Sequence, residues 1–218
     1  MNKKYIVFDL DGTLLDTIGD LTNACNYALI SLSYKKIDIN TVRMCIGDGL
    51  YNLILRLIKI VSKREEIDKE EILNGCSYFV EYYKIHLMDE TKPFKGIVNL
   101  LEKLNQDGYQ CYILSNKDDF AVKMLSKKYF GDLITNALGH VDGIPIKPNP
   151  ELLFYLLGDH QKEDVLLVGD SLTDASMMIK SNVDGILVSW GYCDRARLEE
   201  SLYLIVDDVD SLYKNIIN

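Results

Sequence analysis

The chain has 218 residues, a formal net charge of −9 and 48% hydrophobic residues. This length is enough for one large domain, or for one domain with a substantial insertion, around a buried core. An acidic chain lacks the positive surface that nucleic acids and anionic membranes attract, so we expect neither as a partner. Since the chain has no membrane-length apolar stretch and its cysteines are few and scattered, we expect a cytoplasmic protein.

Residues 4–9 form a short apolar run that ends at a carboxylate, a pattern that predicts a strand buried on both faces. The next comparable run, residues 109–114, comes about a hundred positions later, although a simple crossover needs only roughly a dozen residues. The sequence between them repeats apolar residues at helical spacing in three series. We therefore expect three or four amphipathic helices to form a cap domain at residues 16–90, and residues 1–15 plus 91–218 to form the core.

After Pro93 the pattern alternates between helices and strands. Following a helix near Ile97, the expected strands are 109–114, 133–138, 164–168, 185–189 and 203–206. The expected helices are at 118–128, 150–158 and 173–181, and a last helix bears Val209 and Ile216. Such alternation is typical of a parallel sheet that is covered on both faces. We predict an α/β fold with a doubly wound, Rossmann-like core and an inserted α-helical cap.

Ligands of such sheets bind outside the carboxyl ends of the strands. Three predicted strands end in polar motifs, which are DLDGT at residues 9–13, SNK at 115–117 and GDSLTD at 169–174. A fourth feature is Lys147, which precedes Pro148 in a segment that cannot be a helix interior. The strand ends therefore mark the predicted site.

The first and third motifs bring the carboxylates of Asp9, Asp11, Asp170 and Asp174 to one sheet edge, where their repulsion requires a cation. A site of oxygen ligands without histidine or cysteine favours Mg²⁺, which completes its shell with water and phosphate oxygens. The sequence therefore predicts Mg²⁺ as cofactor and a small phosphorylated metabolite as substrate. Two aspartates at i and i+2 can serve as nucleophile and as acid and base.

Donors for the phosphoryl oxygens are also present. Lys147, the Ser115 hydroxyl and the backbone amides near Gly12 and Asn116 form the electrostatic clamp that phosphoryl transfer needs. Gly12 removes a side chain where the backbone must approach the ligand closely.

These motifs, in this order, resemble the four motifs of the haloacid dehalogenase-like (HAD) superfamily. The resemblance covers the whole chain, and the helical insertion after the first motif matches the subgroup with a helical cap. The sequence is most similar to phosphoglycolate phosphatase-like proteins, through IGDGL at 46–50, KPNPE at 147–151 and VSWGY at 188–192. Dehalogenases themselves are excluded, since they lack a carboxylate at the position of Asp11.

The resemblance implies a role for each motif residue. Asp9 is the nucleophile, Asp11 is the general acid and base, and Mg²⁺ is held by Asp9, the Asp11 carbonyl and Asp170. Asp174 supports the metal or Lys147. The implied phosphate-binding residues are Gly12, Thr13, Ser115, Asn116 and Lys147, of which Lys147 is also catalytic.

The segment Gly47-Asp48-Gly49 has two interpretations, a turn before the helix that starts at Leu50 or a cap loop that binds substrate. We predict a Mg²⁺-dependent phosphatase, monomeric or homodimeric, that hydrolyses a phosphoglycolate-like phosphomonoester through an aspartyl-phosphate. The same motifs fit a β-phosphoglucomutase-like phosphotransferase, a pyrophosphatase or a non-catalytic binding module.

Overall fold

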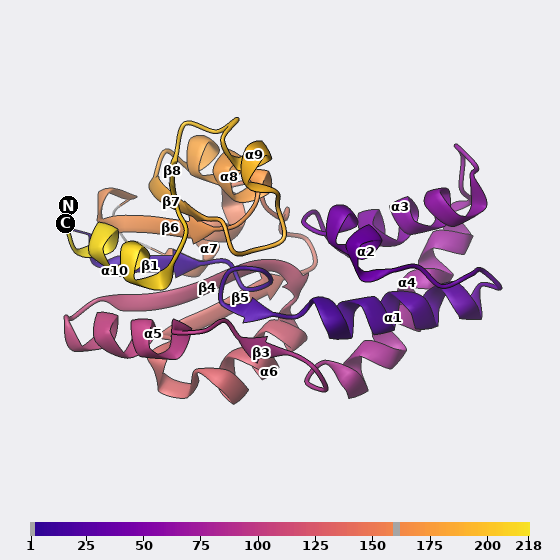
Figure 1. Cartoon of the computed structure of the whole chain (residues 1–218), viewed down its shortest axis with the longest axis horizontal. Coiled ribbons are helices and arrows are strands. Elements are labelled where there is room, and N and C mark those ends of the chain that lie inside the picture. The colour runs from indigo at the N-terminus through magenta and orange to yellow at the C-terminus, as the bar shows by residue number, and fades with distance from the viewer. Residues whose placement is uncertain (1–2, 159–161) are drawn as a thin grey trace. The chain divides into compact units, whose positions relative to one another are not determined.

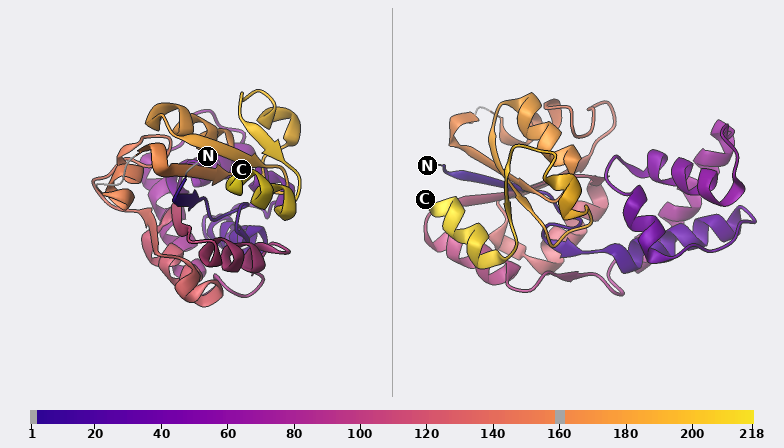
Figure 2. Two further views of the ribbon diagram at one scale, coloured as in Figure 1. Left: turned by 90° about the vertical axis from the view of Figure 1, so that its left-hand side faces the viewer. Right: turned by 45° about the horizontal axis from the view of Figure 1, so that its top comes forward.

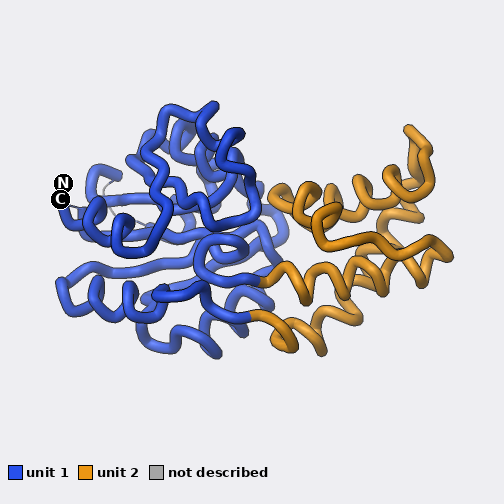
Figure 3. Tube along the Cα trace, viewed as in Figure 1, with its two compact units in different colours: residues 1–16, 92–218 blue, residues 17–91 orange. Residues whose placement is uncertain are grey.

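Two units make up the chain, one of Met1–Asp16 with Lys92–Asn218 and one of Thr17–Thr91 (Figure 3). The structure is a computed structural model that describes residues 3–158 and 162–218. His160, which the sequence places at the surface, lies outside these residues. The boundaries fall beside the positions expected for the edges of the insertion, and the roles of core and cap stay predictions.

A six-stranded sheet forms the centre of the first unit, in the order β5-β4-β1-β6-β7-β8 (Figure 1). All of its strand pairings are parallel. The strands are β1 (Tyr5–Phe8), β4 (Gln110–Asp118), β5 (Asn136–His140), β6 (Val165–Gly169), β7 (Asp184–Val188) and β8 (Leu204–Val206). The predicted doubly wound, Rossmann-like α/β fold with an inserted helical unit is confirmed.

Helices cover both faces of this sheet (Figure 2). They are α5 (Ile97–Gln106), α6 (Asp119–Tyr129), α7 (Glu151–Leu157), α8 (Leu172–Ser181), α9 (Arg195–Leu198) and α10 (Val209–Ile217). Val7, Leu114 and Leu167 belong to one buried cluster with the leucines of α7 and the methionines of α8. Since Ile6 and Ile113 alternate with them and are also fully buried, the strands are apolar on both faces, as their sequences predict.

Several elements differ from the predicted ones. Strand β5 begins at Asn136, three residues later than predicted, because Gly131–Leu133 form a 3-10 turn and pairing with β4 starts at Asn136. A short antiparallel pair, β2 (Leu15–Asp16) with β3 (Lys92–Pro93), joins the two segments on either side of the insertion. Two-residue strands carry too little pattern to be found from sequence.

The second unit contains α1 (Ile18–Ser31), α2 (Ile39–Cys45), α3 (Leu50–Ser62) and α4 (Lys69–His86). Its core comes from the apolar faces of α1, α3 and α4, including Leu21, Leu57 and Phe79. Asp38 caps α2 by accepting hydrogen bonds from the amides of Asn40 and Thr41. No helix within residues 3–158 and 162–218 is long and apolar enough to cross a membrane.

Candidate active site

The register of the central strands determines where the polar motifs lie. Phe8 pairs with Ile113 of β4 and with Val168 of β6, so Asp9 follows β1 at the same level at which β4 and β6 reach their polar ends. From β1 the chain runs outward to β4 and β5 and then returns to β6 on the other side. The motifs therefore meet at a topological switch point, where open α/β sheets bind their ligands.

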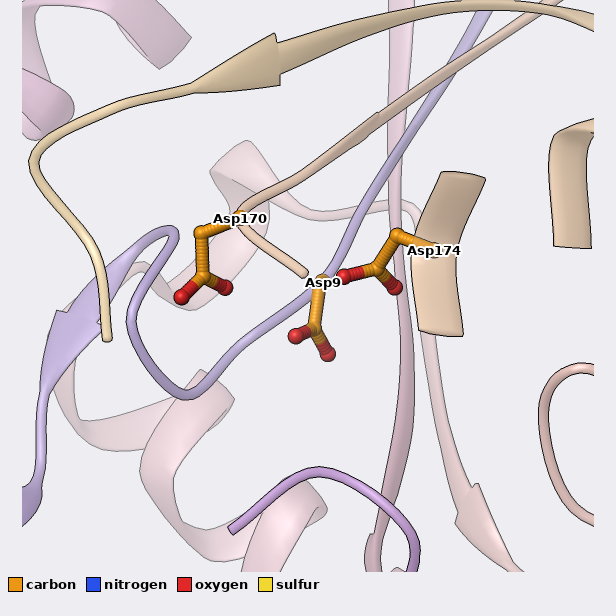
Figure 4. A group of neighbouring side chains, drawn as sticks. All are labelled: Asp9, Asp170 and Asp174. Carbon is orange, nitrogen blue, oxygen red and sulfur yellow. The ribbon is translucent and has the colours of Figure 1, made fainter. Parts of the chain in front are cut away.

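Three aspartates form a compact buried cluster at this edge (Figure 4). Asp9 follows β1, Asp170 follows β6 and Asp174 lies in the first turn of α8. Each offers a carboxylate oxygen within 4.8 Å of the others. Asp170 is 2% exposed and Asp174 is fully buried, so their charges are poorly solvated.

Lys147 neutralises part of this cluster. Its Nζ lies 2.8 Å from Asp9 Oδ1 and 2.8 Å from Asp174 Oδ1. The backbone of Lys147 is fixed by the Asn116 side chain, which accepts a hydrogen bond from the Lys147 amide and donates one to its carbonyl oxygen. The structure thus brings together the predicted site residues of three motifs, and the side chain of Asn116 positions Lys147.

Asp174 is held by its own helix as well. Its Oδ2 accepts hydrogen bonds from the Ser171 amide and hydroxyl, while the Ser171 hydroxyl accepts one from the Asp174 amide, which completes a capping box at the start of α8. Because Oδ1 faces Lys147, both oxygens of Asp174 already have partners. This arrangement supports Lys147 through Asp174.

Each carboxylate oxygen of Asp170 accepts a hydrogen bond. Its Oδ1 accepts a hydrogen bond of 2.9 Å from the Thr13 hydroxyl, and its Oδ2 accepts one of 2.7 Å from the Tyr192 amide. Gly12 and Gly191 both face this carboxylate, and a Cβ at either position would overlap it. Gly12 also has a φ of +86°, which other residues rarely adopt. The tight turn of the first motif is therefore shaped around Asp170.

Asp11 has a separate partner. Lys117 Nζ lies 3.0 Å from both of its carboxylate oxygens. The side chains are only 7% and 13% exposed, so this is a largely buried ion pair. Sequence reasoning noted Lys117 at the end of its strand but gave it no role.

Burial dominates the protonation of the cluster. Burial is the largest cause that raises the pKa of Asp9; Lys147 lowers this pKa and the charge of Asp174 raises it, and the resulting pKa is about 7. Burial also raises the pKa of Asp170, with additional repulsion from Asp9 and Asp174. For Lys147, burial lowers the pKa, but attraction to Asp174 and Asp9 outweighs it and raises the pKa above its usual value.

The charges of the site fit a divalent cation. Four carboxylates, those of Asp9, Asp11, Asp170 and Asp174, face the ammonium groups of Lys117 and Lys147. When all six are ionised, two negative charges remain in excess. The carboxylate oxygens of Asp9, Asp170 and Asp174 lie close enough together to hold one ion, and carboxylate oxygens suit a hard cation that prefers oxygen ligands.

The Gly47-Asp48-Gly49 segment lies in the second unit and has its own internal partner. Arg56 of α3 forms an ion pair with the Asp48 carboxylate and donates a hydrogen bond to the carbonyl oxygen of Cys45. Gly49 is the N-cap of α3. Gly47 and Gly49 have φ of +133° and +88°, which allow the turn. A role for this segment in substrate binding stays a prediction.

Trp190 and Tyr192 after β7 are further contacts that sequence reasoning missed. The Trp190 indole donates a hydrogen bond to the Thr13 carbonyl oxygen, and the Tyr192 hydroxyl donates one to Asp16. The available signal was the VSWGY segment at 188–192, which was used only for the family resemblance. The contact that matters most for the site is the hydrogen bond from the Tyr192 backbone amide to Asp170. Since nearly every residue type has such an amide, this contact cannot be predicted from the sequence.

Comparison with known proteins decides the family. Residues 6–188 match the family described as haloacid dehalogenase-like hydrolase. The chain belongs to this family. The predictions of a HAD fold and of a hydrolytic enzyme are therefore confirmed.

Several relatives of this HAD hydrolase are named phosphoglycolate phosphatase. The one from Chromobacterium violaceum is 31% identical over 221 residues, which cover 98% of this chain and 97% of the relative. Phosphoglycolate phosphatase 1 of Pseudomonas aeruginosa is 30% identical, with 96% of this chain and 78% of the relative covered. The crystal structure of a predicted phosphoglycolate phosphatase from Haemophilus somnus has a TM-score of 0.88 and 26% identity, and covers 99% of both chains. The HAD hydrolase is thus similar to phosphoglycolate phosphatases over nearly its whole length.

Proposed function

We propose that this HAD hydrolase is a Mg²⁺-dependent phosphatase that hydrolyses a small phosphomonoester through an aspartyl-phosphate on Asp9. The observation that carries the proposal is the placement of Asp9 at a strand end, paired with buried Lys147 and next to Asp170 and Asp174. In this position the Asp9 carboxylate can attack phosphorus while the neighbouring Lys147 ammonium group binds the phosphoryl oxygens. The family membership supports the same reaction class.

The residues that would hold Mg²⁺ are Asp9, Asp170 and the carbonyl of Asp11. The excess of two negative charges and the close approach of Asp9 and Asp170 support these two carboxylates as ligands, and the carbonyl of Asp11 is the ligand that the family resemblance implies. Bound Mg²⁺ supplies positive charge that offsets the repulsion between the aspartates and the phosphate and stabilises charge in the transition state. Thr13 and the Tyr192 amide would keep Asp170 oriented for this role.

The protein groups carry the chemistry in two steps. A carboxylate oxygen of Asp9 attacks phosphorus as the bond to the leaving oxygen breaks, and protonated Asp11 gives its proton to that oxygen. Asp11 then takes a proton from water, whose oxygen attacks phosphorus and releases Asp9 and inorganic phosphate. The donors for the phosphoryl oxygens would be Lys147, the Ser115 hydroxyl, and the backbone near Gly12, Thr13 and Asn116.

For the substrate we propose phosphoglycolate or a similarly small anion. The names of the relatives support this choice at 30–31% identity. The net charge of −9 disfavours nucleic acids and anionic membranes as partners. We place the reaction in the cytoplasm, and whether the enzyme is a monomer or a homodimer stays a prediction.

The test is phosphate release from phosphoglycolate, sugar phosphates, nucleoside monophosphates and pyrophosphate, with Mg²⁺ and with chelator. We expect release from at least one monoester that requires metal and that is lost in Asp9→Asn, with no change in the far-UV circular dichroism spectrum. Asp210→Asn, which changes an exposed aspartate in α10, is the matched control and should keep full activity. Undiminished release by Asp9→Asn would refute the nucleophile.

The alternative functions give different results in this assay. Isomerisation of a sugar phosphate without net phosphate release would indicate a phosphotransferase like β-phosphoglucomutase. Release from pyrophosphate alone would indicate a pyrophosphatase. No activity that depends on Asp9 with any compound would favour a non-catalytic binding module.

A further inference from the structure

The carboxylate proposed as acid and base is bound by Lys117, the last residue of the SNK motif, to which the family resemblance assigns no role. Lys117 Nζ is equidistant, at 3.0 Å, from Oδ1 and Oδ2 of Asp11. A cation that contacts both oxygens fixes the orientation of the carboxylate as well as compensating its charge. The pair is largely shielded from water, with 7% and 13% of the two side chains exposed.

The end of β4 is built to place Lys117. The pairing of β4 with β5 shifts register between Leu114 and Asp118, the stretch that contains Lys117. Such irregularities turn side chains out of the regular alternation and are common beside active sites.

Gly139 of β5 allows this irregular backbone to come close. A Cβ on Gly139 would lie 2.5 Å from the Lys117 carbonyl oxygen and 2.6 Å from the Cα of Asp119. The Gly139 amide also donates a hydrogen bond of 3.0 Å to the Asp119 side chain. The position of Lys117 is therefore fixed by the sheet and not only by its long side chain.

The site's other lysine has a different task. Lys147 lies between Asp9 and Asp174 and its backbone is fixed by Asn116. It contacts the nucleophile, whereas Lys117 contacts the residue that must exchange a proton with the leaving oxygen. The two lysines thus serve different carboxylates.

We infer that Lys117 is a positioning residue that orients the Asp11 carboxylate for proton transfer to the leaving-group oxygen. This inference rests on the proposed function, since it assigns Lys117 to the acid step of that reaction. The loss of Lys117 should therefore depend on the leaving group of the substrate. The loss of a residue that binds the phosphoryl group should not, because every phosphomonoester carries the same phosphoryl group.

Leaving groups of different basicity test this assignment. An alkyl phosphate such as phosphoglycolate needs a proton on its leaving oxygen, whereas p-nitrophenyl phosphate has a leaving group that departs without one. We expect Lys117→Met to lower kcat/KM for the alkyl phosphate at least about tenfold more than for p-nitrophenyl phosphate. Lys117→Arg, which keeps the charge, should recover part of this difference.

Two controls make the result specific. Lys123→Met removes an exposed lysine that pairs with Asp119 on α6, and it should leave the ratio of the two kcat/KM values unchanged. In an Asp11→Asn background there is no acid to position, so adding Lys117→Met should not change the ratio further. Circular dichroism melts show whether each variant is folded.

An equal loss of kcat/KM on both substrates in Lys117→Met, which leaves their ratio unchanged, would overturn the inference. If Lys117→Met fails to fold, Lys117→Gln, which also removes the ammonium group, carries the same comparison, and an unchanged ratio there overturns the inference as well. A parent enzyme that hydrolyses neither substrate would instead remove the proposed function itself.

Discussion

Replacement of Lys147 by methionine gives the sharpest measure of how strongly the carboxylates repel each other. The side chain is 3% exposed, and its Nζ lies 2.8 Å from each of two acidic partners. Methionine keeps most of the side-chain volume and removes the ammonium group. Asp9 and Asp174 then stay buried without a neighbouring positive charge from residue 147. Removal of one partner from a buried ion pair costs about 3–5 kcal/mol of unfolding free energy. We expect that loss at pH 8 in the presence of chelator.

The pH dependence of this loss follows from Asp9. In the parent protein Asp9, with a pKa of about 7, takes up its proton only below that pH. Without the ammonium group the pKa of Asp9 rises further, so the folded variant already holds this proton at pH 8 and gains more stability on acidification. The loss caused by Lys147→Met should therefore shrink by about 1.4 kcal/mol, which is one pKa unit, between pH 8 and pH 5.5.

The assay is urea unfolding followed by the fluorescence of Trp190, the only tryptophan of the chain. Its indole donates a hydrogen bond of 3.2 Å to the Thr13 carbonyl oxygen, so the signal reports on the unit that carries the site. The matched control is Lys123→Met, whose ion pair is exposed on the lysine side and should be worth about 0–1 kcal/mol. A loss for Lys147→Met no larger than that of the control, or one that grows on acidification, would refute the reasoning.

Three further predictions concern the aspartate cluster and the metal. In the chelated protein the folded state holds a proton on Asp9 up to about pH 7, whereas the unfolded chain releases it near 3.8, so unfolding free energy should fall as pH rises through this window. Mg²⁺ binds the ionised carboxylates, so it should raise the melting temperature more at pH 8 than at pH 5.5; an equal rise at both would contradict this. Gly191→Ala places a Cβ against Asp170 and should weaken Mg²⁺ binding about 10–100-fold by calorimetry, and an unchanged Kd would show that Asp170 is not positioned there.

Sequence alone predicts the parts of this fold in which apolar residues recur in a regular pattern. Strands β1 and β6 are apolar on both faces, so each stands out as a run that ends at Asp9 or Asp170. Their parallel arrangement then brings these aspartates together, and Asp9 and Asp170 could be paired as site residues from that argument. The insertion was visible because its helices have apolar faces of their own.

Other parts of the site depend on contacts that no local pattern records. Lys117 and Asp11 are 106 positions apart, and their pairing depends on an irregular stretch of β4. The hydrogen bond from Tyr192 to Asp170 comes from the backbone amide, which every residue except proline possesses. Motifs thus indicate which groups react, whereas the groups that orient them require the structure.

The two buried lysines, Lys117 and Lys147, reduce the electrostatic repulsion between the carboxylates of the site. Lys147 touches Asp9 and Asp174, and Asn116 fixes its backbone, so its loss should affect folding and every substrate alike. Lys117 touches the acid that must gain and lose a proton during turnover, so its loss should depend on the leaving group. If both lysines only balanced charge, neither Lys117→Met nor Lys147→Met would change the ratio of kcat/KM between the alkyl phosphate and p-nitrophenyl phosphate. A difference between the two profiles would show that each lysine serves a separate step.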